Sequence, residues 1–280
     1  MHRLAVPLAA TLLATTPLPA PLAAQQHEGP SLFVRFQHQG RVSYGALHGD
    51  RIQEIDGDIF GQHRPTDRWV GLAEVKLLPP TPAKKVIAVG LNYQSHLGER
   101  TPAEYPGLFA KYPTSLVGQG EDVVQPPDSK NLHYEGEMVL VIGKACTNVS
   151  EADAMSCVFG ITAGNDISER DWQAADLQWF RAKGSDTFGP VGPAIAWGVN
   201  PDDVLVETRV NGEVRQHERT SDLIFGTAEI VSYVSRYVTL EAGDLIFTGT
   251  PQSTKAMSPG DVVEVEVEHV GVLRNTVRRR

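Results

Sequence analysis

The sequence predicts a mainly β protein with a few helices, of the α+β class. Three short runs that alternate apolar and polar residues lie near the N-terminus, at 31–36, 41–47 and 51–55, and glycine-containing turns separate them. Alternation with a period of two is typical of half-buried strands, and such turns join neighbouring strands. We therefore expect a small antiparallel meander in this part of the chain.

Further strands are expected along the rest of the chain. Residues 86–90 form a short apolar run, and residues 261–270 alternate strictly, as a half-buried strand does. The dipeptide Asn211-Gly212 predicts a tight hairpin, because both residues of such a turn must accept positive φ.

Only two helices are predicted. The first runs from Asp166 to about Leu177. The second runs from Thr227 to Val238, with Thr227 as its N-cap and apolar side chains along one face. The small number of helical patterns is the second reason for the mainly β prediction.

The composition excludes several classes of protein. The chain has 280 residues, with 25 Lys and Arg against 34 Asp and Glu, and so a formal net charge of −9. A hydrophobic content of 41% and a charged content of 21% are typical of a globular protein. Nucleic acid is not expected as a partner, because phosphate binding needs clustered basic residues.

The first 24 residues predict a secretory signal peptide. Arg3 is the only charge near the start, an apolar stretch runs from about Leu4 to Thr16, and small residues precede a cleavage point after Ala24. The stretch is too short to span a bilayer, and no later run is long enough for a membrane span. A disordered extension is the alternative. The expected location is therefore periplasmic or secreted.

The remaining chain divides into two predicted domains. A small N-terminal β domain covers residues 25–80 and ends near a Pro-rich segment, and a larger domain covers residues 81–280. The two cysteines, Cys146 and Cys157, lack the paired spacing of a zinc site. A single bridge between them is possible in principle, but two free, buried thiols are the preferred interpretation.

Three carboxylates suggest a metal site. Residues 134–144 form an apolar strand, and residues two apart on a strand point to the same side, so Glu135 and Glu137 project together. A buried pair of this kind needs a proton, a basic partner or a metal ion. The alternative is a solvated strand end.

Asp166 adds a third carboxylate, where an apolar strand leads into a helix start; the alternative role is a helix cap. Arg170 and Gln173 follow at helical spacing and are expected on the same face as Asp166. Three carboxylates without His or Cys form an all-oxygen ligand set, which suits Mg²⁺, Mn²⁺ or Ca²⁺.

His96 and Glu99 form a second candidate group. In a helical turn, residues three apart are neighbours, so the carboxylate of Glu99 would orient the imidazole of His96 as a general base for water. The following segment, residues 98–120, is long and contains three prolines, as a lid over a functional site does.

Six segments, in this order, together resemble the fumarylacetoacetate hydrolase family: residues 86–99, 133–144, 164–173, 183–193, 243–251 and 259–275. The resemblance runs from about residue 84 to 277. It implies a mixed β-roll with a lid over a metal site, a small N-terminal β meander domain, and a homodimer.

The resemblance also implies roles for residues. Glu135, Glu137 and Asp166 match the family's ligands of Mg²⁺, or of Mn²⁺ or Ca²⁺. His96 and Glu99 match a dyad that activates water, and Lys183 matches a lysine that faces substrate oxygens. The positions that match substrate-binding ones are Arg170, Gln173 and Thr250.

The function implied is hydrolysis of a C–C bond in a 1,3-dicarbonyl or acylpyruvate-type 2-oxo acid. The metal would hold the oxygens of the developing enolate, His96 and Glu99 would activate water, and Lys183 would stabilise the oxyanion. One departure from the family pattern follows the Gly-Thr-Pro motif, where residues 252–255 read Gln-Ser-Thr-Lys.

Two alternatives remain at this stage. The first is a metal-dependent decarboxylase, or an isomerase or tautomerase, of 2-oxo or 2-hydroxydienoic diacids, because these reactions share the enolate. The second is a protein that binds an oxo acid without turning it over.

Overall fold

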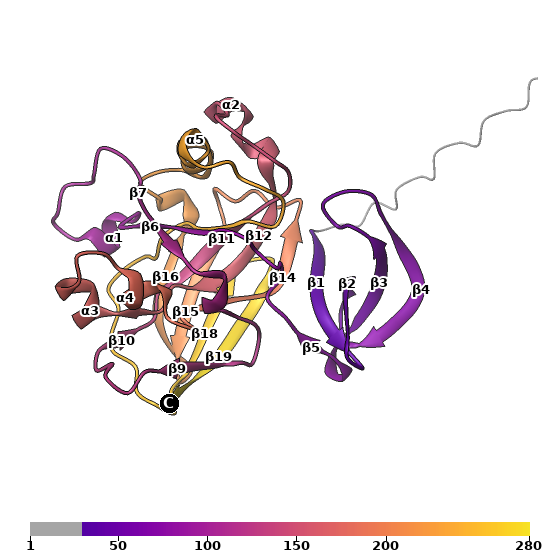
Figure 1. Cartoon of the computed structure of the whole chain (residues 1–280), viewed down its shortest axis with the longest axis horizontal. Helices are drawn as coiled ribbons and strands as arrows, with labels where there is room; N and C mark the ends of the chain where they lie inside the picture. The colour runs from indigo at the N-terminus through magenta and orange to yellow at the C-terminus, as the bar shows by residue number, and fades with distance from the viewer. Residues whose placement is uncertain (1–29) are drawn as a thin grey trace, which may run out of the picture.

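The fold consists of two large β-sheets, a two-stranded sheet and a few short helices, which confirms the predicted fold class (Figure 1). The computed structural model describes residues 30–280, so the predicted signal peptide at residues 1–24 lies outside the described range. Within residues 30–280, no helix has both the length and the apolar character needed to cross a membrane.

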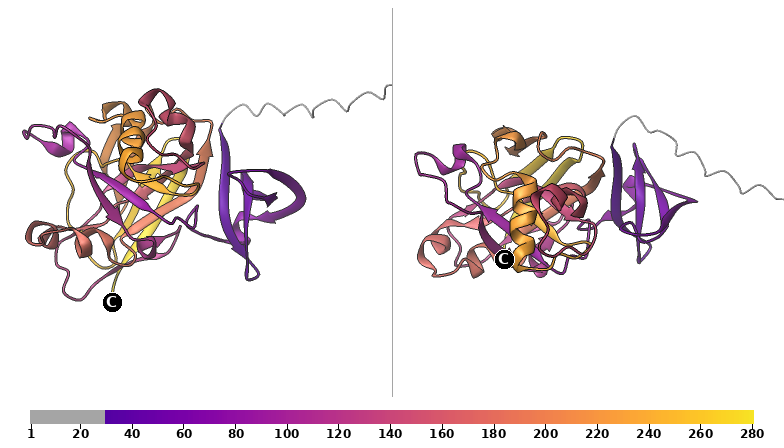
Figure 2. Two further views of the ribbon diagram at one scale, coloured as in Figure 1. Left: turned by 45° about the horizontal axis from the view of Figure 1, so that its top comes forward. Right: turned by 90° about the horizontal axis from the view of Figure 1, so that it is seen from above.

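The predicted N-terminal meander is present. It consists of β1 (Ser31–His38), β2 (Arg41–His48), β3 (Arg51–Gly57) and β4 (His63–Gly71), each antiparallel to the next. The sequence analysis did not identify β4, because its side chains are mostly exposed and polar and lack a clear alternation. The unit stands beside the larger body of the protein (Figure 2).

The meander continues into the main sheet through an antiparallel pairing of β1 with β14 (Gly189–Trp197). The sheet order is β4-β3-β2-β1-β14-β12-β11-β17-β6-β7, and two short strands pair at its side. The remaining strands of this sheet are β5 (Lys76–Leu77), β6 (Val86–Gly90), β7 (Gly107–Lys111), β8 (Leu116–Val117), β11 (Gly136–Ile142), β12 (Val158–Asn165) and β17 (Leu245–Phe247).

The second sheet has five strands and packs against the first. Its order is β16-β15-β18-β19-β9, with bounds β9 (Asp122–Gln125), β15 (Leu205–Val210), β16 (Glu213–Arg219), β18 (Val262–Val267) and β19 (Gly271–Arg279). The predicted hairpin is confirmed, since Asn211 and Gly212 have φ of 54° and 80° between β15 and β16. A two-stranded pair, β10 (Leu132–His133) and β13 (Ser168–Glu169), completes the strands described.

Strand β11 is buried on both faces. Its residues Met138 and Leu140 pack with side chains of the second sheet, whereas Val139 packs against Phe247 in a separate cluster. Because successive side chains of a strand point to opposite faces, Glu137 lies on the face of Val139, away from the second sheet.

Gly136 shows why a glycine separates the two glutamates. A Cβ at this position would lie 1.9 Å from the hydroxyl of Thr208, a fully buried residue of β15. A side chain there would therefore force the two sheets apart, and the pattern Glu-Gly-Glu follows from the close approach of β11 to β15.

The α-helices of the described residues are short. Their bounds are α1 (Gln94–Leu97), α2 (Glu151–Ala154), α3 (Arg170–Ala175), α4 (Phe180–Gly184) and α5 (Thr227–Tyr237). Both helices predicted from the sequence need correction. The prediction of one helix from Asp166 to Leu177 was wrong. The chain first forms β13, and α3 begins only after Glu169, whose side chain caps it by accepting from the Trp172 N–H at 2.8 Å.

Helix α5 was predicted at almost its observed bounds, but Thr227 is not its N-cap. Gly226 occupies that position, and the Thr227 hydroxyl, one residue further along, donates to Asp202 at 2.7 Å. The long segment 98–120, predicted as a lid, is also less irregular than expected, because it contains β7, which pairs with β6 in the main sheet.

The expectation of two free thiols was wrong, because Cys146 and Cys157 form a disulfide. Cys146 follows β11 and Cys157 precedes β12, and these two strands are antiparallel neighbours. The strand pairing brings both ends of the connecting segment together, which the spacing of the cysteines alone does not reveal. The bridge closes the end of the β11–β12 hairpin opposite to Glu135 and Glu137.

Removing this disulfide is expected to destabilise the fold. Cys146→Ala with Cys157→Ala should lower the free energy of unfolding by about 2–3 kcal/mol, because the open loop gives the unfolded chain more conformations. Denaturant titration of the oxidised protein and of the double variant measures this. Equal midpoints and slopes for the two proteins would contradict the prediction.

Candidate functional site

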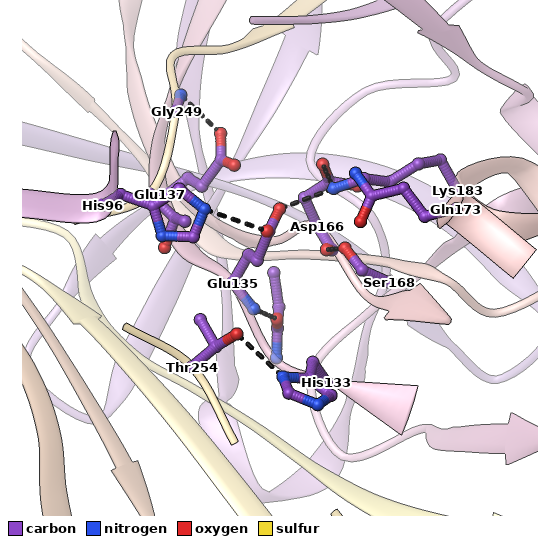
Figure 3. A network of polar contacts seen from close by, with 12 residues as sticks. His96, His133, Glu135, Glu137, Asp166, Ser168, Gln173, Lys183, Gly249 and Thr254 are labelled. Carbon is purple, nitrogen blue, oxygen red and sulfur yellow. Dashed lines mark hydrogen bonds and ion pairs between the residues drawn. The ribbon is translucent and has the colours of Figure 1, made fainter. Parts of the chain in front are cut away.

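Three buried carboxylates converge at one end of the β11–β12 pair (Figure 3). Glu135 precedes β11, Glu137 lies in it, and Asp166 follows β12. The register pairs Gly136 with Asn165, and the backbone N–H of Asp166 donates to the carbonyl of Glu135 at 2.8 Å. One oxygen from each carboxylate can be chosen so that all three lie within 4.8 Å of one another.

Two buried lysines face this group. The Lys183 ammonium, on α4, bridges Glu135 Oε2 at 2.5 Å and Asp166 Oδ2 at 2.6 Å. Lys111, at the end of β7, donates to Asp166 Oδ1 at 2.6 Å and to the Lys183 carbonyl. The structure thus brings the predicted Lys183 to the three carboxylates and adds Lys111.

The sequence analysis missed Lys111, although a signal was available. On a strand, Lys111 lies on the same side as Phe109, which suggests a lysine on an apolar face. Burial, the largest effect, lowers the pKa of the Lys111 ammonium, and the nearby charge of Lys183 acts in the same direction against the attraction of Asp166.

Glu135 and Glu137 differ in their charge environment. Burial disfavours the charged form of Glu135, but Lys183 and then Arg170 outweigh it and hold its pKa well below the usual range. For Glu137, burial is again the largest effect, and Asp166 and Glu135 add to it, so its pKa is raised well above the usual range. Among residues 30–280, no basic side chain forms an ion pair with Glu137.

Glu137 nevertheless occupies a fixed position. Its Oε2 accepts from the Gly249 N–H at 2.7 Å. Gly249 has φ of 107°, and a Cβ there would lie 2.7 Å from Asn92 Cβ, so a glycine is required for the backbone to approach Glu137 so closely. The surrounding structure therefore holds a buried carboxylate that has no counter-charge in contact.

This donor set fits a hard divalent cation. All the candidate ligand atoms are carboxylate oxygens, and the three side chains are at most 7% exposed. The Lys183 ammonium already bridges two of the carboxylates, which shows that the position attracts a cation. Glu137 has no basic side chain in contact among residues 30–280, so a bound cation would stabilise its charged form. Oxygen ligands of this kind suit Mg²⁺, Mn²⁺ or Ca²⁺.

The predicted substrate-binding residues lie around the same pocket. The Arg170 guanidinium donates to Glu135 Oε1 at 2.5 Å and to Gln173 Oε1 at 2.7 Å, so Arg170 and Gln173 stand together, as predicted. Thr250 also lines the pocket, but its hydroxyl donates to the Gly136 carbonyl and accepts from Gln216. Through these hydrogen bonds, Thr250 helps to hold β11 in place.

His96 faces the carboxylates, but Glu99 does not accompany it. His96 Nε2 lies 3.7 Å from Glu135 Oε1, and its Nδ1 contacts the carbonyl of Gln252. Glu99 is exposed and does not line the pocket, and within the described residues no hydrogen bond joins it to His96. A carbonyl only accepts, so Nδ1 carries the proton and Nε2 is the nitrogen that faces the pocket.

Two further polar residues of the site, His133 and Thr254, were missed. His133 Nδ1 contacts the Thr254 hydroxyl at 2.8 Å, and that hydroxyl also accepts from Arg170 at 2.9 Å. Burial and then the charge of Arg170 lower the pKa of His133 to about 4, so His133 is neutral at pH 7. Thr254 belongs to the segment 252–255 that departs from the family pattern. This departure from the family pattern could have identified Thr254 as a residue of the site.

These side chains surround one open pocket of about 570 Å³. Its lining includes His96, Glu135, Glu137, Arg170 and Lys183, together with apolar side chains on one side. The β-roll thus brings buried carboxylates, lysine and histidine side chains to the wall of one pocket. This combination is typical of an enzyme whose active site is built around carboxylates.

The chain belongs to the fumarylacetoacetate hydrolase family. The model of the fumarylacetoacetate hydrolase C-terminal domain matches residues 85–278, and a second model, described as Rv2993c-like N-terminal, matches residues 32–80. The resemblance found in the sequence is therefore confirmed.

Similar proteins carry several different activities in their names. Oxaloacetate tautomerase YisK of Bacillus subtilis is 39% identical over 262 residues, covering 82% of this chain and 87% of that protein. The crystal structure of a 2-hydroxyhepta-2,4-diene-1,7-dioate isomerase from Mycobacterium marinum has a TM-score of 0.84 and 40% identity, and the match covers 89% and 99% of the two chains.

A second similar structure contains a metal. It is a maleylpyruvate hydrolase from Sphingobium sp. SYK-6 in complex with manganese(II) ion and pyruvate, with a TM-score of 0.74, 26% identity and coverage of 89% and 99%. Members of this family thus include tautomerases, isomerases and hydrolases.

Two buried glutamates offer a matched test of the metal site. Glu137→Gln should abolish binding of Mn²⁺ while raising the metal-free free energy of unfolding at pH 7 by about 1–3 kcal/mol, because the wild-type carboxyl group must on folding either take up a proton or stay charged without a counter-charge. Calorimetric titration with Mn²⁺ and denaturant unfolding measure the two effects.

Glu169→Gln is the control. Its carboxylate is also buried, but it accepts from the backbone N–H groups of Lys130, Asn131 and Trp172. This variant should lose stability and keep Mn²⁺ binding. Undiminished Mn²⁺ binding by Glu137→Gln would exclude Glu137 as a ligand.

Proposed function

We propose that this protein is a divalent-metal-dependent enzyme that interconverts the enol and keto forms of a 2-oxo acid. The observation that carries the proposal is the imidazole of His96, which a backbone carbonyl orients beside three buried carboxylates. One such base suffices for proton transfer, whereas the predicted water-activating dyad also needs Glu99. The names of the tautomerase and isomerase relatives support the same reaction class.

The charges of the pocket suit an enolate. The formal charges of Glu135, Glu137 and Asp166 and of Lys111, Lys183 and Arg170 sum to zero, although the contacts of these basic side chains are with Glu135 and Asp166. A bound dication would supply Lewis acidity toward the oxygen at C2 and two positive charges, which the carboxylate and the enolate oxygen of the substrate would balance.

Each chemical step falls to a residue of the chain. Arg170 and Gln173 would orient the substrate carboxylate, and the Lys183 ammonium would stabilise negative charge on the oxygen at C2. His96 Nε2 would carry the proton to or from C3. In the enol-to-keto direction, Nε2 would accept the proton of the enol oxygen and deliver a proton to C3, so no other reagent is consumed.

Hydrolysis of an acylpyruvate C–C bond is the second candidate, and it is the function predicted from the sequence. The pocket volume of about 570 Å³ favours it, because this volume exceeds the need of a four-carbon acid and leaves room for a longer substrate and water. The same enolate would form on cleavage. This reaction requires Glu99 to approach His96.

The two candidates can be distinguished with acetylpyruvate and oxaloacetate in the presence of Mn²⁺. Tautomerisation changes the ultraviolet absorbance of the enol without forming smaller products, whereas hydrolysis of acetylpyruvate yields acetate and pyruvate. His96→Gln should lower the tautomerisation rate about 100-fold or more and keep Mn²⁺ binding, as expected for loss of a general acid–base. A rate unchanged by this substitution would falsify the role of His96.

Glu99→Gln provides the second comparison. If hydrolysis is the reaction, this variant should lose it together with His96→Gln. If acetate and pyruvate never form while enol absorbance relaxes, tautomerisation is supported. Absence of both reactions, with tight binding of pyruvate, would favour a protein that binds oxo acids without turnover.

We also infer that the protein is exported. The signal-peptide pattern of residues 1–24 supports this, and the Cys146–Cys157 disulfide adds independent support, because disulfides persist mainly in oxidising compartments.

Expression in a Gram-negative host tests export. The full chain should be found in the periplasmic fraction with a mass lacking about 24 residues, whereas a variant starting at residue 25 should stay in the cytoplasm. Recovery of the full chain in the cytoplasm with its N-terminus intact would contradict the proposal.

A further inference from the structure

A second cavity opens directly beside the site pocket. Its volume is about 500 Å³, and it shares five lining residues with the pocket of about 570 Å³. The shared wall consists of Gly90, Leu91, Arg100, Phe109 and Trp179. Since the same side chains border both spaces, the two cavities are adjoining parts of one hollow. We call the second cavity the annex.

The annex differs from the pocket in its chemistry. The pocket is lined by the carboxyl groups of Glu135 and Glu137, the Lys183 ammonium and the Arg170 guanidinium, whereas most side chains of the annex are aliphatic or aromatic. The apolar residues that line only the annex are Leu97, Ala103, Leu108, Leu177 and Phe225. Phe109 and Trp179 meet edge to face, with ring centroids 5.3 Å apart, on the wall between the two spaces.

Leu91 marks the junction of the two cavities. It lines both, it is 39% exposed, and its φ is 58°, a conformation that a leucine adopts only under strain. The next residue, Asn92, is fully buried and fixes this backbone. Its amide nitrogen donates to the carbonyls of Thr248 and Phe225, and its oxygen accepts from the Phe225 N–H.

Strained backbone of this kind is maintained where the surrounding structure over-determines it, and it concentrates at ligand sites. At this position it places an apolar side chain on the boundary between the charged pocket and the annex. Asn92 also forms hydrogen bonds with the backbone of Phe225, which lines the annex. One residue therefore fixes both the backbone next to Leu91 and part of the annex wall.

We propose that the annex binds the apolar tail of the substrate, so that the substrate class is 2-oxo acids with an aliphatic or aromatic group beyond C3. This inference rests on the proposed function, which places the 2-oxo acid head at the carboxylates. An apolar tail that leaves water for this space is stabilised in proportion to the area it buries.

Arg100 raises the alternative of a substrate whose tail ends in a carboxylate. Among residues 30–280 it is the one cationic residue that lines the annex, and a second carboxylate at the end of the tail would pair with it. Its Nε already donates to the Leu97 carbonyl at 2.9 Å, and apolar side chains outnumber polar ones around it. The lining therefore favours a tail without a terminal charge.

A series of simple 2-oxo acids tests the proposal by binding alone. Pyruvate, 2-oxobutanoate, 2-oxohexanoate and 2-oxooctanoate lack a 4-carbonyl group, so they cannot undergo the C–C hydrolysis considered above. In calorimetric titrations of the Mn²⁺-loaded protein, affinity should rise about two- to fourfold per added methylene until the annex is filled. An affinity that does not change with chain length would overturn the proposal.

A dicarboxylic homologue distinguishes a substrate with a charged tail from one with an apolar tail. Tighter binding of 2-oxooctanedioate than of 2-oxooctanoate would show that a terminal carboxylate is recognised, and it would overturn the proposal in favour of a diacid substrate. Weaker binding of the diacid supports it, because a charge would then be buried among apolar side chains.

Two variants test whether the dependence of affinity on chain length arises in the annex. Leu108→Asp places a charge in the annex wall from the edge strand β7 and should flatten the chain-length dependence. Val214→Asp is the control, because Val214 is a similarly exposed apolar residue on the edge strand β16 and lines neither cavity; it should keep the dependence. An equal dependence in both variants would overturn the assignment to the annex.

The outcomes also distinguish this inference from the proposed function. Pyruvate reports on the 2-oxo acid head alone. If pyruvate fails to bind, or binds equally well without Mn²⁺, the proposed function is wrong. If pyruvate binding requires Mn²⁺ but longer homologues bind no better, the proposed function stands and only the annex proposal fails.

Discussion

The electrostatic cost of holding Glu135, Glu137 and Asp166 together in the protein interior governs the organisation of this structure. Lys183, Lys111 and Arg170 offset the charge of Glu135 and Asp166 through direct contacts. Among residues 30–280, Glu137 receives a backbone N–H and no ion pair, so its charged form is disfavoured until a cation binds beside it. The same imbalance that makes the site costly without a cation gives it affinity for one.

The two sheets provide the rigidity that this arrangement requires. The register of β11 and β12 fixes the spacing of the carboxylates, and Gly136 lets β15 approach β11 closely enough to hold it. At the opposite end of the same hairpin, the Cys146–Cys157 disulfide closes the connecting segment. The strand pair that carries the site is therefore restrained at both ends. Such support on regular elements is what keeps a functional site in a defined geometry.

Polar and apolar surfaces meet along a single boundary in the pocket. Lys183 lies 5.1 Å from the ring centroid of Phe109, whose other neighbour is Trp179 at the edge of the annex. A substrate with a charged head and an apolar tail has matching surroundings on each side of this boundary. The proposed reaction and the proposed substrate class thus depend on the same wall of the pocket, although they are tested by different measurements.

Several strands, the hairpin at Asn211-Gly212, the family and many residues of the site could be predicted from the sequence, because alternation, turn chemistry and ordered motifs are local properties. The sequence could not determine the contacts of these residues. Lys111, His133 and the disulfide partners are brought to their places by strands distant in sequence. Glu99, although three residues from His96, is exposed and does not line the pocket, and the carbonyl of Gln252 contacts the imidazole of His96. Only the tertiary structure decided these pairings, because they depend on strand register and on the packing of segments far apart along the chain.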